Sequence, residues 1–202
     1  TRWSLVTGVQ TCALPICAAA ITHGDIVIHN AAPQYLDMVK LVFNRLGVDW
    51  DNKGNDIIVP PDQCLCVEPD LDNAIPEISV MPWPAFPTDL MSIAIVVATQ
   101  AKGTTLFHDW MYPSRMFFTD KLVSMGAQIV LCDPHRCIVQ GPTQLLADDI
   151  TGPDIRAGMA LLLAALSAKG MSTIRNIRQI DRGYENIDKK LAKLGASIER
   201  IA

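Results

Sequence analysis

The stretch that decides the fold is 155–201, which reads IRAGMALLLAALSAKGMSTIRNIRQIDRGYENIDKKLAKLGASIERI. Its first part, 155–168, is apolar on nearly every side, a pattern typical of a helix that is buried all round. The short run 171–176 predicts a β-strand. In 187–194, apolar residues recur at helical spacing between lysines, which predicts a second helix with one solvated face. Gly195 follows this helix and can take the left-handed conformation that ends it, so the chain turns into a further short strand.

The same unit of helix, strand, helix and strand occurs three times along the chain. Each copy contains one glycine before its first strand and another after its second helix. The pairs are Gly24 and Gly47, Gly103 and Gly126, and Gly170 and Gly195. Their members are 23, 23 and 25 residues apart, a constancy typical of internal repeats. The strands expected after these glycines are 25–30, 48–51, 104–109, 128–131, 171–176 and 197–201.

These three units predict an α/β fold. The repeats are placed at about 18–69, 70–142 and 143–202. Their inner helices are strongly apolar and have to be buried. Three α-β-α-β repeats with buried inner helices require sheets that wrap around helices, which is the reverse of the usual α/β arrangement.

The first seventeen residues differ from the rest of the chain. Residues 1–17 carry a single charge, at Arg2, contain Pro15 and show neither helical nor alternating periodicity. They also make a poor signal peptide, which needs a basic start and an apolar run. This segment resembles a translated sequencing adapter. We therefore expect residues 1–17 to be non-native, to pack poorly and to contribute nothing to function, with the genuine chain beginning near Ala18.

Composition excludes several classes of function. Half of the residues are hydrophobic and 19% are charged, which suits a soluble globular protein. The net charge of −4 gives no electrostatic argument for binding nucleic acid. Because no apolar run reaches the roughly 18 residues needed to cross a bilayer, no membrane association is expected and the expected location is cytoplasmic. The six cysteines are too sparse for a disulfide scaffold and lack metal-ligand spacing, so no metal site is predicted.

Four loop motifs lie at related places in the repeats, and the first two belong to the second repeat. Residues 84–89 (PAFPTD) lead into its inner helix, where Asp89 can cap the helix or complement its dipole. Capping is the interpretation that the residues alone favour. Residues 109–117 (DWMYPSRMF) follow the first strand of this repeat and contain Arg115. Taken alone, a loop arginine is usually a solvated surface group.

The other two motifs belong to the third repeat. Residues 153–158 (PDIRAG) open its inner helix, with Asp154 suited to the N-cap position. Arg156 in the first turn opposes the helix dipole, so a purely structural role suits it poorly, whereas an anionic ligand would suit this helix terminus. In 179–185 (QIDRGYE), a glycine suited to a hinge or turn follows Arg182, and Asp181 can orient the guanidinium group.

The order of these units and motifs resembles the enolpyruvyl transferases, from Ala18 to the end of the chain. In that family such units form an inverse α/β barrel domain, which is the fold class expected here. Cyclases that act on RNA 3′-phosphates share related units, so the loops have to decide the function. The strings at 84–89 and 181–185 (DRGYE) resemble the branch that acts on UDP-N-acetylglucosamine. The shikimate-phosphate branch carries a different, Asp-Ser-Ser-Ala-like sequence at the first place and is the runner-up.

The resemblance implies enolpyruvyl transfer from phosphoenolpyruvate to the 3′-hydroxyl of UDP-N-acetylglucosamine, with no metal or organic cofactor. The implied catalytic residues are Asp89, Arg115, Arg156 and Arg182. The implied substrate-binding residues are Asp89, Met111, Arg115, Asp154, Arg156 and Arg182. Asp89 would bind the sugar hydroxyl and take its proton, Arg115 would point toward the enolpyruvyl group, and Met111 would contact the sugar nucleotide through its backbone. The planar guanidinium groups of Arg156 and Arg182 suit a phosphate or a carboxylate.

The resemblance also implies that half of the site is missing. In the family the site lies between two such domains, and the other domain supplies a lysine–asparagine pair and a loop whose cysteine or aspartate donates a proton. The sequence contains no match to either, and none of its cysteines lies in the expected R-C-x-G-R context. We therefore expect a missing N-terminal domain to be the partner, and no turnover by this chain alone. A non-catalytic half that binds a nucleotide sugar is the third alternative.

Overall fold

Three apolar helices form the centre of the molecule. The computed structural model describes residues 3–4, 9–152 and 154–201. The inner helices are α1 (Val9–Thr22), α3 (Met91–Gln100) and α5 (Ile155–Ser167). All three contact one another, and in α3 every residue from Met91 to Thr99 is buried. The prediction of inner helices that are buried all round is confirmed.

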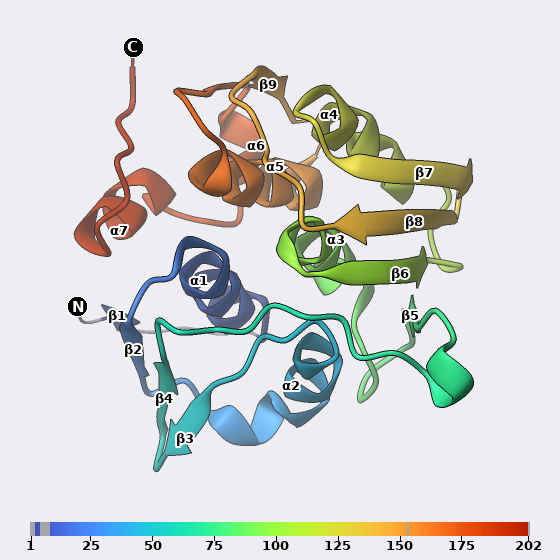
Figure 1. Ribbon diagram of the computed structural model, residues 1–202. Coiled ribbons are helices and arrows are strands. Elements are labelled where there is room, and N and C mark those ends of the chain that lie inside the picture. Colours follow the sequence, from blue (N-terminus) through green and yellow to red (C-terminus); the bar gives the residue numbers. More distant parts are fainter. Residues whose placement is uncertain (1–2, 5–8, 153, 202) are drawn as a thin grey trace.

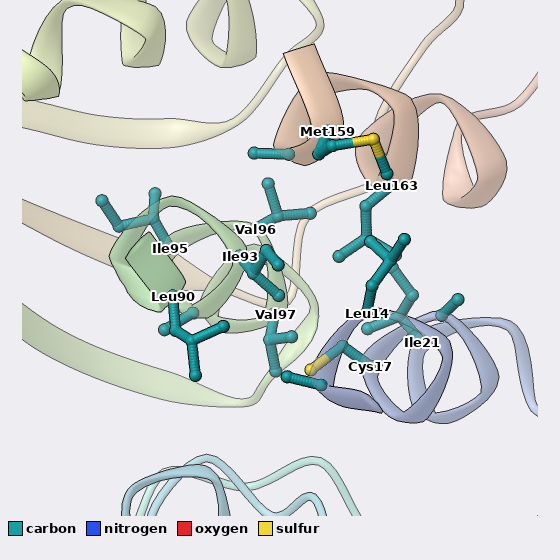
Figure 2. Close-up of a cluster of buried hydrophobic side chains, with 14 of the residues drawn as sticks. Leu14, Cys17, Ile21, Leu90, Ile93, Ile95, Val96, Val97, Met159 and Leu163 are labelled. Atoms are coloured by element: carbon teal, nitrogen blue, oxygen red, sulfur yellow. The ribbon is translucent and has the colours of Figure 1, made fainter. Parts of the chain in front are cut away.

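One hydrophobic cluster joins the inner helices. Figure 2 shows side chains from all three, including Leu14 and Cys17 of α1, Val97 of α3 and Leu163 of α5, and all four are buried. A large apolar side chain that is fully buried contributes about 1.5–3 kcal/mol to stability. This cluster is therefore the main reason for the helices to lie together at the centre.

Three sheets lie outside the inner helices (Figure 1). The first has the order β1-β2-β4-β3, the second β5-β6-β8-β7, and the third pairs β10 with β9. Their strands are β1 (Trp3–Ser4), β2 (Ile26–His29), β3 (Asp51–Lys53), β4 (Asp56–Val59), β5 (Glu77–Ser79), β6 (Gly103–His108), β7 (Gln128–Asp133), β8 (Arg136–Gly141), β9 (Asp149–Thr151) and β10 (Thr173–Arg175). Helices inside and sheets outside make this an inverse α/β barrel, as the sequence predicts.

Each repeat begins with a short strand that the sequence analysis did not predict. β1, β5 and β9 each precede an inner helix, and each pairs in parallel with the strand that follows that helix. Such a β-α-β crossover brings the start of the inner helix to the end of a strand. Loops from both places therefore meet at one end of each repeat.

Outer helices cover the remaining surface of the repeats. They are α2 (Asp37–Asn44), α4 (Thr119–Ser124), α6 (Arg178–Asp181) and α7 (Ile187–Lys193). Short 3₁₀ helices are η1 (Pro33–Tyr35), η2 (Leu71–Asn73), η3 (Thr88–Leu90) and η4 (Arg115–Phe118). In α7 the buried residues are Ile187 and Leu191, whereas its lysines are exposed, which confirms the predicted solvated face.

The glycines after the outer helices have the conformation that the repeat pattern predicts. Gly47, Gly126 and Gly195 have φ angles of 81°, 103° and 102°. At Gly47 a Cβ atom would also lie 2.2 Å from the carbonyl oxygen of Cys64. A side chain is therefore excluded there by both backbone conformation and space.

Two expected strands differ from those observed. The strand expected at 48–51 lies at Asp51–Lys53, as β3. The strand expected at 197–201 is absent from the described part of the third repeat. In the other repeats this strand pairs with the next one along the chain, β3 with β4 and β7 with β8. Among the described residues, 197–201 has no corresponding strand to pair with.

The prediction that residues 1–17 pack poorly is wrong for 12–17. Residues 1–2 and 5–8 lie outside the described residues. From Val9 the chain forms α1 and continues through Pro15, and both Ile16 and Cys17 are fully buried. The missing periodicity misled the prediction, because a helix surrounded by apolar groups has no polar side to generate a period. The non-native origin of the segment remains a prediction.

Candidate active site

The candidate site lies where α3 and α5 begin. η3 leads directly into α3, while Asp154 caps α5 by accepting hydrogen bonds from the backbone N–H groups of Arg156 (2.7 Å) and Ala157 (3.1 Å). Ser92 Oγ donates to the Arg156 carbonyl at 3.3 Å and so links the two helix starts. A small open cavity lies between them, and its lining residues are Thr88, Met91, Ser92, Asp109, Arg115, Phe118, Asp154, Arg156 and Ala157.

Asp89 is held by two arginines from different parts of the chain. Arg156 Nε donates to Asp89 Oδ1, and Arg115 Nη1 lies 3.5 Å from the same oxygen. The carboxylate side chain is 24% exposed, so a ligand can still reach it. Asp89 lies in the first turn of η3, whose N-cap residue is Pro87, and its carboxylate faces these guanidinium groups.

Arg115 is fixed on two sides. Its Nη1 atom donates to Thr88 Oγ1 at 2.5 Å. Its guanidinium carbon lies 4.0 Å from the centre of the Tyr112 ring, a cation–π contact. Only 21% of the side chain is exposed, so Arg115 is not the solvated loop arginine that its sequence context alone would suggest.

Asp109 is a site residue that the sequence analysis missed. It is fully buried, lines the cavity and accepts a hydrogen bond of 2.5 Å from Thr88 Oγ1. Its other oxygen accepts from the backbone N–H groups of Met111 (3.1 Å) and Tyr112 (3.2 Å). The available signal was an aspartate directly after a strand, a position where its side chain often bonds the backbone two residues ahead.

Arg156 occupies the first turn of α5, where the helix dipole disfavours a cation. The Asp89 carboxylate offsets this cost through the ion pair with Arg156 Nε. This pair joins the second repeat to the third. The anionic partner seen here is a carboxylate of the protein itself, and binding of an anionic ligand by Arg156 remains a prediction.

Arg182 has no described contact with the cluster. Its Nη1 atom donates to Gln179 Oε1 at 3.4 Å. The backbone next to it approaches α5 closely, because a Cβ atom on Gly183 would lie 2.3 Å from Cδ1 of Ile155. Asp181, which we expected to orient Arg182, instead accepts hydrogen bonds of 3.0 and 2.8 Å from Arg200.

Tyr184 connects the segment around Arg182 to the cluster. Burial raises the pKa of its hydroxyl, and the nearby negative charge of Asp89 raises it further, against the opposing effect of Arg156. Asp89, Arg115 and Arg156 are thus brought together as predicted. Arg182 belongs to the same segment as Tyr184, and its described side-chain contact is with Gln179.

Met111 and the neighbouring tryptophans differ in their exposure. Met111 packs against the core and its N–H group donates to Asp109 Oδ1, so a backbone contact with a ligand would have to use its carbonyl. Trp83 and Trp110 are 58% and 51% exposed. Trp110 Nε1 donates to the Val80 carbonyl at 2.7 Å, which connects the loops on the two sides of the site.

The charges of the site suit an oxyanion beside a proton acceptor. Two guanidinium groups provide planar pairs of N–H donors for phosphate or carboxylate. The Asp89 carboxylate between them can accept a proton from a hydroxyl group. Within the described residues, no group of three or more His, Cys, Asp or Glu side chains is arranged to hold a metal ion. The same residues contain no helix long and apolar enough to cross a membrane.

Comparison with known proteins identifies one family. The profile of the family described as EPSP synthase (3-phosphoshikimate 1-carboxyvinyltransferase) matches residues 3–191. Two similar curated proteins are UDP-N-acetylglucosamine 1-carboxyvinyltransferases. The one from Bradyrhizobium diazoefficiens is 51% identical over 183 residues, which cover 91% of this chain and 42% of the relative. The one from Bacteroides fragilis is 50% identical over 91% of this chain and 43% of the relative. The chain therefore spans less than half the length of these relatives.

Solved structures share the fold. The enolpyruvyl transferase NikO from Streptomyces tendae superposes with a TM-score of 0.81 at 24% identity, over 98% of this chain and 45% of NikO. EPSP synthase from Acinetobacter baumannii superposes with a TM-score of 0.58 at 15% identity, over 86% of this chain and 40% of that protein. At these identities the likeness concerns the fold alone.

Proposed function

Because this chain belongs to the EPSP synthase (3-phosphoshikimate 1-carboxyvinyltransferase) family, we propose that it is the C-terminal half of an enolpyruvyl transferase. The acceptor is the 3′-hydroxyl of UDP-N-acetylglucosamine and the donor is phosphoenolpyruvate. This reaction is the first committed step of peptidoglycan precursor synthesis and takes place in the cytoplasm. The names of relatives at about 50% identity support the acceptor.

The observation that carries the proposal is the Asp89 carboxylate between Arg115 and Arg156. Phosphoenolpyruvate has a phosphate and a carboxylate, and each can be bound by a guanidinium group. The acceptor hydroxyl has to lose its proton as its oxygen attacks. Asp89 lies beside both arginines, so a hydroxyl group bound next to the substrate anions can transfer its proton to this carboxylate. Substrate anions and acceptor hydroxyl would therefore meet at one carboxylate.

The chemistry requires fixed positive charge more than it requires a nucleophile on the protein. A proton adds to the vinyl carbon of phosphoenolpyruvate, and the sugar oxygen adds to the adjacent carbon. Phosphate then leaves from the tetrahedral intermediate while the carbon that gained a proton loses one to a base, which regenerates the vinyl group. Charge changes mainly on the phosphate and the carboxylate, so arginines already held in place can stabilise the transition state. Arg115 is held in this way by Thr88 and Tyr112.

The remaining predicted residues have supporting roles in the proposal. Asp154 keeps the start of α5 in place through its cap, and Arg156 follows directly. Met111 would offer its carbonyl to the sugar nucleotide. Arg182 would rotate from Gln179 toward phosphoenolpyruvate once the substrate is bound. The proton donor and the facing wall of the site would come from the N-terminal half of the enzyme.

Release of inorganic phosphate tests the proposal. The chain alone should release none from UDP-N-acetylglucosamine and phosphoenolpyruvate. Joined at α1 to the N-terminal part of the Bradyrhizobium diazoefficiens relative, it should turn over. Turnover with 3-phosphoshikimate instead would favour the runner-up. Nucleotide-sugar binding without turnover in the joined protein would favour the non-catalytic half.

A further inference from the structure

We propose that Asp109 is a positioning residue that fixes the direction of the Thr88 hydroxyl and thereby holds Arg115 against Asp89. This role rests on the proposed function, because it assigns Arg115 to substrate binding. The hydrogen bonds that carry it are Arg115 Nη1 to Thr88 Oγ1 and Thr88 Oγ1 to Asp109 Oδ2, both 2.5 Å long.

The carboxylate of Asp109 has all its contacts inside the protein. It is fully buried, and it accepts three hydrogen bonds, from the Thr88 hydroxyl and from the N–H groups of Met111 and Tyr112. A buried charge is tolerated only when such bonds replace its hydration. The backbone of Asp109 is fixed as well, since its N–H donates to the His135 carbonyl (2.8 Å) and its carbonyl lies 2.7 Å from His135 Nδ1.

The protons in this chain of contacts can point only one way. A carboxylate at Asp109 accepts and an arginine donates, whereas the Thr88 hydroxyl has a single proton. That proton therefore points to Asp109 and leaves the lone pairs of Oγ1 for Arg115. The same carboxylate holds the N–H group of Tyr112, whose ring stacks on Arg115. Asp109 thus organises both contacts that fix the guanidinium group.

Substitutions that keep nearly the same side-chain shape separate the effect of hydrogen-bond direction from the effect of packing. In Asp109→Asn, the amide NH₂ group has to face either the Thr88 hydroxyl or the N–H groups of Met111 and Tyr112. In the first orientation the amide donates to Thr88 Oγ1, so the Thr88 proton has to point toward Arg115. In the second, the NH₂ group faces two backbone N–H groups, so donors face donors and no hydrogen bond forms. Thr88→Val keeps the volume and removes the hydroxyl, while Thr88→Ser keeps the hydroxyl. Thr105→Val is a matched control, because this buried hydroxyl has no partner among the described residues.

The first measurement uses the chain itself and needs no substrate. Side-chain ¹⁵N spectra should show slow rotation of the Arg115 guanidinium group, with its signals assigned by their loss in Arg115→Lys. Thr88→Val and Asp109→Asn should abolish the slow rotation, whereas Thr88→Ser and Thr105→Val should retain it. If Asp109→Asn does not fold, the two Thr88 variants decide. Slow rotation that persists in folded Thr88→Val would overturn the proposal.

The second measurement uses the joined enzyme and separates this inference from the proposed function. Thr88→Val and Asp109→Asn should lower kcat/KM about 10- to 100-fold, the effect of losing one hydrogen bond to a charged group. Thr88→Ser should lose far less than Thr88→Val. No turnover by the unsubstituted joined enzyme would contradict the proposed function, while the spectra still test the positioning role. Normal kcat/KM in Thr88→Val, in an active enzyme, would overturn the positioning role alone.

Discussion

Leu14→Ala should lower the free energy of unfolding by about 2–5 kcal/mol, the range for removing a large aliphatic side chain from a packed core. Leu14 is 2% exposed and belongs to the cluster that α1 shares with α3 and α5. Deletion of residues 1–17 removes Ile16 and Cys17 as well, both fully buried. At about 1.5–3 kcal/mol for each large apolar side chain, the deletion loses on the order of 5 kcal/mol.

This loss is a large part of the whole stability of a typical domain, about 5–15 kcal/mol, so the truncated chain should unfold at a much lower urea concentration. Urea denaturation followed by circular dichroism measures both variants. Leu71→Ala is the matched control, because Leu71 is 90% exposed and its truncation should change stability by no more than about 0.5 kcal/mol. If Leu14→Ala behaves like Leu71→Ala, or if the truncated chain keeps its stability to within about 1 kcal/mol, α1 does not pack as described.

Three further predictions concern the site, a glycine and an ion pair. Asp89→Ala in the joined enzyme should lower kcat at least about 100-fold in the phosphate-release assay, because a positioned proton acceptor is lost; near-normal kcat would contradict its role. Gly47→Ala should lower the free energy of unfolding by at least about 2 kcal/mol, because it adds a clash to a strained φ of 81°. Gly54→Ala is the control, since Gly54 has a φ of 63° and open space around it, and it should lose clearly less stability. Equal urea midpoints for the two variants would argue against the clash. Arg200 holds the pKa of Asp181 below its usual value of 3.8, so this pair stabilises the fold above about pH 4 and the contribution is lost as the pH falls below that. Asp181→Asn should therefore show a smaller loss of stability on acidification to pH 3 than the unsubstituted chain, and an identical pH dependence would show that the pair contributes nothing.

The fold could be predicted because its signals are local. Constant spacing between glycines and strongly apolar inner helices are properties of short segments, and both were confirmed. The convergence of Asp89, Arg115 and Arg156 followed from equivalent positions in the repeats. The link between Asp109 and Thr88 could not be predicted, because it depends on how the end of β6 meets the start of α3 in three dimensions.

Other parts of the structure have too weak a local sequence pattern to be predicted. β1, β5 and β9 contain only two or three residues each, and each is specified by pairing with a strand beyond the next helix. Residues 12–17 carry no periodicity, although they form part of a helix buried among apolar neighbours. In both cases tertiary contacts, which local patterns do not encode, determine the outcome.

Triplication of the unit has allowed equivalent backbone positions to specialise. Directly after β2, β6 and β10 stand Asn30, Asp109 and Asn176. The two asparagines have φ angles of 54° and 58°, and so provide left-handed turns, whereas the aspartate provides a buried carboxylate. At the starts of the inner helices, Asp154 caps α5 while Asp89 faces arginines. A duplicated fold supplies spare copies of each position, so one copy can acquire a chemical role while its counterparts continue to shape the backbone.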